Sequence, residues 1–144
     1  MTTIAYKDGI IAGDTQLSAD NVIYRVCKIY QTPDGGLVGG CGEWNKAYAA
    51  IDWLLNGKVG EPPEFKEAQL LLIDHKGALW FADESFPAYP ILDKHAAIGC
   101  GAQAAMLAMN AGATAIEAVR QVISVDSGTS APVLFLGLEK KRKK

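Results

Sequence analysis

The residue with the clearest chemical potential in this sequence is Thr2, which follows the initiator Met1 directly. Removal of that methionine would leave the threonine with a free α-amine beside its own hydroxyl, and these two groups are a base and a nucleophile within one residue. An α-amine has an unperturbed pKa of roughly 7.7–8.0, so a useful fraction is unprotonated at neutral pH and can accept a proton. The chain start therefore favours acyl transfer through a Thr2 ester.

A tight hairpin is expected to position this threonine. Two strand-forming runs, 2–6 and 10–12, flank the dipeptide Asp8-Gly9. An Asp-Gly pair between apolar runs is a strong hairpin signal because glycine adopts positive φ at little cost. The second strand ends at Gly13-Asp14. The first fourteen residues are therefore predicted to be one antiparallel strand pair.

The rest of the chain reads as blocks of strands and blocks of helices. Apolar residues at helical spacing predict helices over 43–55 and 102–110, and the capping-box pattern from Thr114 to Glu117 opens a third. Residues 15–21 read as a polar connection and 86–90 as an irregular segment. Strands are expected at 22–24, 28–30, 37–38, 70–73, 78–81, 96–98 and 133–138. This block order indicates an α+β fold, with antiparallel sheets and helices on their outer faces.

The composition is that of an ordinary globular protein. The chain has 144 residues, of which 49% are hydrophobic and 21% charged, so one domain over 1–139 with a basic tail at 140–144 is expected. The net charge of −2 argues against a nucleic-acid surface. No apolar stretch approaches the ~20 residues of a membrane span, and the chain start lacks the pattern of a secretion signal. We therefore expect a cytoplasmic protein without membrane or nucleic-acid partners.

The cysteines and histidines give no sign of a metal site. Cys27, Cys41 and Cys100 are an odd number without CxxC spacing, which is typical of reduced thiols in the cytosol. His75 and His95 are far apart, so no zinc site can be argued. Neither a metal nor an organic cofactor is expected.

Several motifs, in their order and spacing, resemble those of the proteasome β-subunit family, and in size and style the chain is similar to its bacterial HslV-like members. These motifs are Thr2-Thr3-Ile4, Gly13-Asp14, Lys28, the glycine-rich stretch 39–42, Ala97-Ile-Gly-Cys-Gly-Ala102 and Val125-Asp-Ser-Gly-Thr129. The resemblance covers most of 2–138. It implies a single proteasome-like domain with the N-terminal-nucleophile (Ntn) hydrolase fold, a four-layer αββα sandwich of two antiparallel sheets.

The resemblance also implies a role for particular residues. Thr2 would be the nucleophile and its α-amine the base. Lys28 would be the cation that eases proton loss from Thr2, and Asp14 the carboxylate that holds Lys28 charged. The backbone N–H of Gly42 would donate to the developing oxyanion, and such a donor is often worth ~3 kcal/mol.

A second group would bind and orient the Thr2 amine. The resemblance implies that Asp126 does this together with Cys100, which stands where the family usually has serine. A thiol is a weaker hydrogen-bond donor than a hydroxyl. The pair Glu43-Trp44 after Gly42 is a further difference, because the family prefers small residues there.

The leading hypothesis is a threonine endopeptidase of the proteasome and HslV kind. It would act on unfolded polypeptides as a homo-oligomeric ring, with an ATP-dependent unfoldase as a possible partner. A catalytically silent scaffold or assembly protein is the alternative, favoured by Glu43-Trp44 and Cys100 and by any retention of Met1. An amide hydrolase for small substrates is a third hypothesis, because this chemistry does not fix substrate size.

Overall fold

The computed structural model describes residues 2–138 of the chain, and the expected basic tail at 140–144 and Met1 lie outside this range. The described residues contain three helices: α1 (Trp44–Leu55), α2 (Ala102–Asn110) and α3 (Ala115–Ile123). The strands are β1 (Thr3–Lys7), β2 (Ile10–Gly13), β3 (Gln16–Ala19), β4 (Val22–Arg25), β5 (Ile29–Gln31), β6 (Leu37–Gly42), β7 (Ala68–Ile73), β8 (Leu79–Asp83), β9 (Tyr89–Ile91), β10 (Ala96–Gly99) and β11 (Leu134–Gly137).

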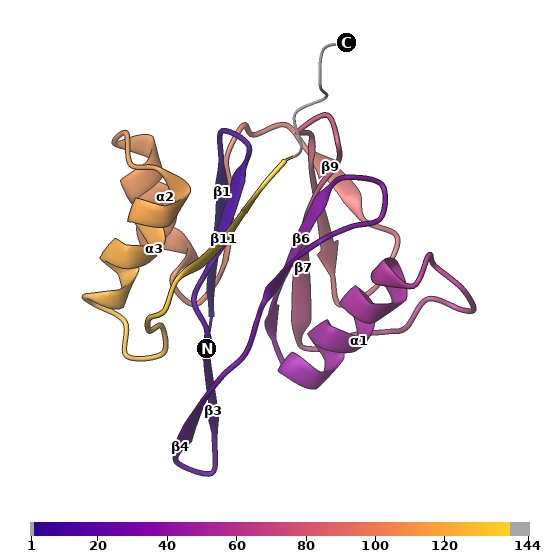
Figure 1. The fold of residues 1–144 in the computed structure, drawn as a ribbon, viewed down its shortest axis with the longest axis horizontal. Coiled ribbons are helices and arrows are strands. Elements are labelled where there is room, and N and C mark those ends of the chain that lie inside the picture. The colour runs from indigo at the N-terminus through magenta and orange to yellow at the C-terminus, as the bar shows by residue number, and fades with distance from the viewer. Residues whose placement is uncertain (1, 139–144) are drawn as a thin grey trace.

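The described strands form two main sheets and one separate hairpin. One sheet has the order β10-β1-β2-β11 and the other the order β5-β6-β7-β8-β9, while β3 and β4 pair with each other. Every pairing is antiparallel. In Figure 1, α2 and α3 lie beyond the sheet that contains β1, and α1 lies on the opposite side of the molecule, beyond β6 and β7. The structure is therefore a mixture of helices and antiparallel sheets.

The largest apolar cluster joins the two main sheets. Ile4 and Ile11 from the first sheet pack with Leu37, Leu71 and other residues of the second. These side chains are shielded from water, and each such aliphatic group contributes roughly 1.5–3 kcal/mol by burial. This cluster holds β1 and β2, which carry the start of the chain, against β5 and β6.

Two further clusters attach the helices. Ile51 and Leu54 of α1 pack on Val38 and Leu70 of the five-stranded sheet. The other cluster lies between the four-stranded sheet and the remaining two helices. The sheet contributes the small residues Ala5 and Ala12, and α2 and α3 contribute Ala105, Met109, Ala115, Ala118, Val119 and Val122. Alanines on that sheet face allow α2 and α3 to approach closely. The capping box predicted for the third helix is confirmed: the Thr114 side chain accepts from the Glu117 N–H, and the Glu117 side chain from the Thr114 N–H.

Two segments differ from the sequence-based expectation. The stretch 15–21, expected as a polar connection, contains β3, which turns through Asp20 and Asn21, both at positive φ, into β4. Its polar residues obscured the strand, although an Asp-Asn pair is a turn signal. The segment 86–90, expected to be irregular, leads into β9 at Tyr89. Pro90 is tolerated within β9 because β9 is an edge strand of the described sheet.

No helix in the described part of the chain has the length and apolar character needed to cross a membrane.

A pair of glycine substitutions should show how tightly the chain start is packed. Gly99 and Gly112 both have positive φ, +97° and +107°, so alanine is strained at either position. A Cβ on Gly99 would lie 2.0 Å from the Thr2 carbonyl oxygen, whereas a Cβ on Gly112 would meet nothing within 4 Å. Gly112→Ala should cost about 1–2 kcal/mol of unfolding free energy. Gly99→Ala should cost a further ~1–3 kcal/mol. Urea unfolding of both variants measures the difference, and equal losses would contradict this packing.

Candidate active site

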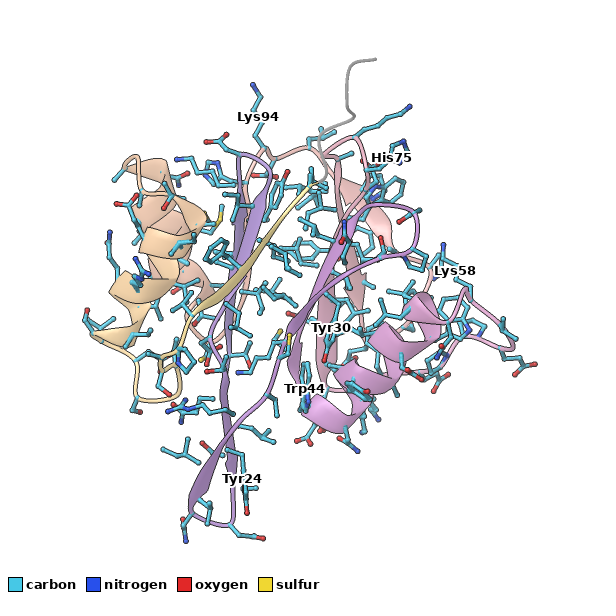
Figure 2. All side chains as sticks on the ribbon, in the orientation of Figure 1. Tyr24, Tyr30, Trp44, Lys58, His75 and Lys94 are labelled. Carbon is cyan, nitrogen blue, oxygen red and sulfur yellow. The ribbon has the colours of Figure 1, made fainter. Side chains whose placement is uncertain are left out.

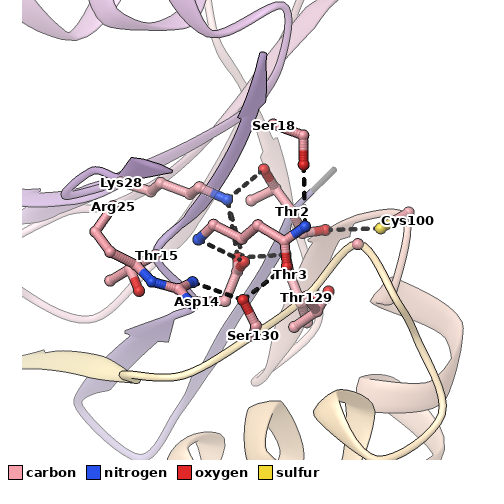
Figure 3. A network of polar contacts seen from close by, with 12 residues as sticks. Thr2, Thr3, Asp14, Thr15, Ser18, Arg25, Lys28, Cys100, Thr129 and Ser130 are labelled. Carbon is pink, nitrogen blue, oxygen red and sulfur yellow. Dashed lines mark hydrogen bonds and ion pairs between the residues drawn. The ribbon is translucent and has the colours of Figure 1, made fainter. Parts of the chain in front are cut away.

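The ammonium group of Lys28 lies at the centre of a buried polar cluster. Lys28 precedes β5, and its carbonyl accepts a hydrogen bond from the Gly40 N–H, which fixes the backbone there. Its side chain is only 2% exposed. The Nζ atom donates to Thr2 Oγ1 at 2.9 Å and to the two Asp14 carboxylate oxygens at 3.1 and 3.2 Å (Figure 3). The structure thus brings three residues together that are up to 26 positions apart in the sequence.

Asp14 is held from several directions at the end of β2. Besides Lys28, its carboxylate accepts the backbone N–H of Thr3 at 3.0 Å and that of Gln16 at 3.1 Å. The Asp14 N–H in turn donates to the Thr3 carbonyl. The first hairpin therefore fixes the carboxylate beside the chain start, as the β1–β2 register Ile4↔Gly13 requires.

Burial and charge act in opposite directions on Lys28. Loss of water lowers the pKa of the Lys28 ammonium, and the Asp14 carboxylate opposes this shift. A buried ammonium keeps its charge only with a well-placed partner, and Asp14 is that partner. A cation 2.9 Å from Thr2 Oγ1 favours loss of the proton from that hydroxyl. The pair therefore gives Thr2 the surroundings of an activated nucleophile.

Cys100 and Asp126 form a second group on the other side of Thr2. The Cys100 thiol donates to Asp126 Oδ2 at 2.9 Å and lies 3.4 Å from the Thr2 carbonyl oxygen. Hydrogen bonds from this thiol and from the Gly128 N–H lower the pKa of Asp126. Burial and the adjacent carboxylate raise the pKa of Cys100. Cys100 is therefore a protonated donor and Asp126 an ionised acceptor.

Thr129 is a further member of this group; the sequence places it at the end of the 125–129 motif but assigns it no role. It is buried, and its hydroxyl shares a hydrogen bond with Thr3 Oγ1 at 2.8 Å and donates to Asp126 Oδ2 at 3.0 Å. The network thus links Asp126 to β1. Thr129 is three residues after Asp126, and a side chain at this spacing can turn back onto the loop. This spacing is the one sequence signal for its contact with Asp126.

A further set of polar contacts joins the β3–β4 hairpin to the loop that carries Asp126. Gln16 Nε2 donates to the Ser127 carbonyl at 3.4 Å, and Ser130 donates to Gln16 Oε1 at 2.6 Å. Arg25 Nη1 donates to the Ser130 hydroxyl at 2.6 Å. The sequence does not indicate these contacts, because no pattern along the chain relates residues 16 and 25 to residues 127–130.

Thr2 opens onto a cavity of about 360 Å³. Gly42, the last residue of β6, lines the same cavity. Its φ is +91°, and a Cβ there would lie 2.2 Å from the Glu67 carbonyl oxygen, so the position accepts only glycine. Cys41 also lines the cavity, and burial raises the pKa of its thiol to about 11, which makes it a poor nucleophile at neutral pH. Residues 2–138 contain no group of three or more His, Cys, Asp or Glu side chains able to hold a metal ion.

The fold is similar to those of solved proteasome-related proteins. BPH from Thiobacillus denitrificans, solved in complex with epoxomicin, matches with a TM-score of 0.66 and 18% sequence identity, covering 96% of this chain and 99% of that one. Eukaryotic HslV from Trypanosoma brucei matches with the same TM-score and identity, covering 94% of this chain and 98% of that one. No protein-family model and no curated protein sequence matches the chain. The chain therefore has the fold of HslV, as the sequence resemblance implied.

Substitutions at the buried ion pair should reveal its role in stability. Lys28→Met keeps the apolar stem but leaves the Asp14 charge buried without its cation, so it should cost about 3–5 kcal/mol of unfolding free energy in urea. The double variant Lys28→Met/Asp14→Asn removes both charges and should cost less than Lys28→Met alone. Lys94→Met, at an exposed position before β10, is the matched control and should change stability by less than about 0.5 kcal/mol. A double variant less stable than Lys28→Met would contradict this assignment.

Proposed function

We propose that this chain is a threonine endopeptidase of the proteasome and HslV kind, built as a single domain over 1–139 with the four-layer αββα arrangement of the Ntn hydrolases. The observation that carries the proposal is the 2.9 Å contact between Lys28 Nζ and Thr2 Oγ1, made by a lysine that is itself paired with the buried Asp14. An ion pair with only a structural role would not need a third member. Here the third member is the hydroxyl of the second residue of the chain.

The reaction begins after removal of Met1. The free Thr2 amine takes the proton of Oγ1, whose loss the Lys28 cation favours, and Oγ1 attacks the peptide carbonyl carbon. The backbone N–H of Gly42 donates to the resulting oxyanion. Breakdown transfers the amine's proton to the leaving nitrogen and forms a Thr2 ester. Water, with the Thr2 amine again as base, hydrolyses the ester and regenerates the hydroxyl.

Asp126 and Cys100 orient the chain start in this scheme. Their contacts reach the Thr2 carbonyl through the Cys100 thiol and the Thr3 hydroxyl through Thr129. The negative charge of Asp126 also stabilises a nearby ammonium group. It therefore favours the positive charge that forms on the Thr2 amine during attack. These groups therefore position the base rather than react themselves.

The structural relatives support the proposal at the level of the fold. BPH was solved with epoxomicin bound, and HslV shares the fold at similar coverage. By the same likeness we propose unfolded polypeptides as substrates, a cytoplasmic location and a possible ATP-dependent unfoldase partner.

A silent scaffold protein is the second candidate, because two observed features depart from the family pattern. Glu43 and Trp44 follow Gly42 directly, and Trp44 begins α1. Cys100 offers a thiol where a hydroxyl is usual. The two candidates make opposite predictions for the processed protein.

Protein that lacks Met1 should hydrolyse small fluorogenic peptides, because only then is the Thr2 amine a base. Thr2→Ala should abolish this activity while circular dichroism shows an intact fold, since the change removes one hydroxyl and one methyl group. Lys28→Ala should also abolish activity. Protein that retains Met1 should be inert, because its Thr2 nitrogen is an amide.

Lys94→Ala, at an exposed lysine outside the cavity, serves as the control for Lys28→Ala and should keep the activity of the wild type. Turnover that survives Thr2→Ala would contradict the assignment of the nucleophile. If processed, folded protein hydrolyses no peptide, the peptidase proposal is wrong and the scaffold function is favoured.

We further propose a homo-oligomeric ring, supported by apolar surface on the β3–β4 hairpin. This hairpin extends beyond the two main sheets (Figure 1), and Tyr24 lies on it (Figure 2). Val22, Ile23 and Tyr24 are 47–56% exposed. Contiguous exposed apolar side chains of this kind are typical of protein contacts.

Replacing Ile23 by glutamate should weaken the assembly, because it places a charge in the contact. Light scattering at micromolar concentration should give a multimer for the wild type and a smaller species for Ile23→Glu. Val59→Glu, at an exposed apolar residue outside the hairpin, should leave the mass unchanged. A wild-type monomer under these conditions would refute the ring.

A further inference from the structure

The cavity beside Thr2 has an acidic wall made by Glu67, Asp83 and Glu84. Glu67 directly precedes β7, and Asp83 and Glu84 lie at the end of β8, which pairs with β7 through Gln69↔Asp83. The Glu84 N–H donates to the Ala68 carbonyl at 3.1 Å. Since Gly42 pairs with Ala68, the sheet register brings this wall to the edge where Gly42 lies.

The three carboxylates are not neutralised by the protein. Within the described residues, Lys28 and Asp14 form an ion pair, and no ion pair involves these three carboxylates. Glu84 accepts the backbone N–H of Glu67 at 2.9 Å, and Asp83 accepts the Gln69 side-chain amide at 3.2 Å, so both partners are neutral groups. The lining of the cavity contains no Lys, Arg or His. The wall therefore presents net negative charge to whatever enters.

The same cavity contains the position of the reacting bond. Thr2 and Gly42 line it, so a carbonyl between nucleophile and oxyanion donor places the neighbouring substrate residues along its walls. The lining also includes the exposed Gln69, whose methylene groups offer apolar surface to an aliphatic stem. The carboxylates come from two paired strands, Glu67 before β7 and Asp83 and Glu84 at the end of β8, so their charge lies along the edge of the sheet. A long, flexible cation matches this distribution better than a compact one.

We propose that this cavity selects peptide substrates with a lysine or arginine side chain beside the scissile bond. The inference rests on the proposed peptidase function and adds its substrate class. The aliphatic stem lies along Gln69, and the ammonium or guanidinium group meets the carboxylates of Glu67, Asp83 and Glu84. Because these side chains are exposed, each contributes modestly, and together they should give about a tenfold preference.

The test compares kcat/KM for fluorogenic peptides that differ only in the residue beside the scissile bond: arginine, norleucine or glutamate. Processed wild-type protein should prefer arginine to norleucine by about tenfold and should discriminate most strongly against glutamate. Higher salt should reduce the preference for arginine, since exposed charges are screened.

The variant Glu67→Gln/Asp83→Asn/Glu84→Gln removes the charges but keeps side-chain size and the hydrogen-bond acceptors. Its ratio of kcat/KM for arginine over norleucine should fall towards one. Glu61→Gln and Asp52→Asn, at exposed carboxylates outside the cavity, are the matched controls and should keep the wild-type ratio. Asp83→Asn alone should lower the ratio partway, which provides a second reading if the triple variant folds poorly.

The outcomes separate the two claims. Turnover of the norleucine peptide without preference for arginine would overturn the substrate class and leave the peptidase function standing. An arginine preference that the triple variant keeps would also overturn it, because the selectivity would then come from elsewhere. Absence of turnover with every peptide would overturn the proposed function, and the substrate class with it.

Discussion

The buried contact of Lys28 with Asp14 is the interaction on which the rest of the site depends. A lysine 2% exposed is unfavourable without a counter-charge, and the Asp14 carboxylate supplies it within 3.2 Å. That carboxylate is itself fixed by the N–H groups of Thr3 and Gln16. Because the backbone of the first hairpin fixes Asp14, it also fixes the direction in which Lys28 Nζ donates to Thr2 Oγ1. The geometry at the hydroxyl is a consequence of sheet register, and so it is available before any substrate binds.

The two sheets give this contact its rigidity. Thr2 and Asp14 belong to one sheet or its immediate flank, while Lys28 precedes the first strand of the other. The apolar cluster between the sheets therefore determines the distance from Lys28 to Thr2. The cavity is formed in the same way, since its walls come from the ends of β6, β7, β8 and β10. The packing of the core therefore also determines the geometry of the cavity in which the chemistry would take place.

Much of this arrangement could be predicted from the sequence, because local patterns carry it. Asp-Gly turns, helical spacing and the Thr114 capping box indicate elements directly, and ordered motifs pointed to Thr2, Asp14, Lys28 and Asp126. The sequence did not reveal the contacts of Thr129 with Thr3 or of Gln16 with Ser127, since hydrogen bonds across more than a hundred positions leave no local pattern. The acidic wall escaped for the same reason: Glu67 and Asp83 become neighbours only through the β7–β8 register.

The central claim is that Thr2, freed of Met1, is a nucleophile activated by its own amine and by Lys28. The most direct measurement is the intact mass of the protein before and after incubation with epoxomicin, followed by peptide mapping. We expect a mass without Met1, then the addition of one inhibitor molecule on the N-terminal peptide, and no addition to Thr2→Ala. Processed, folded protein that gains no mass, or that is modified away from Thr2, would contradict it.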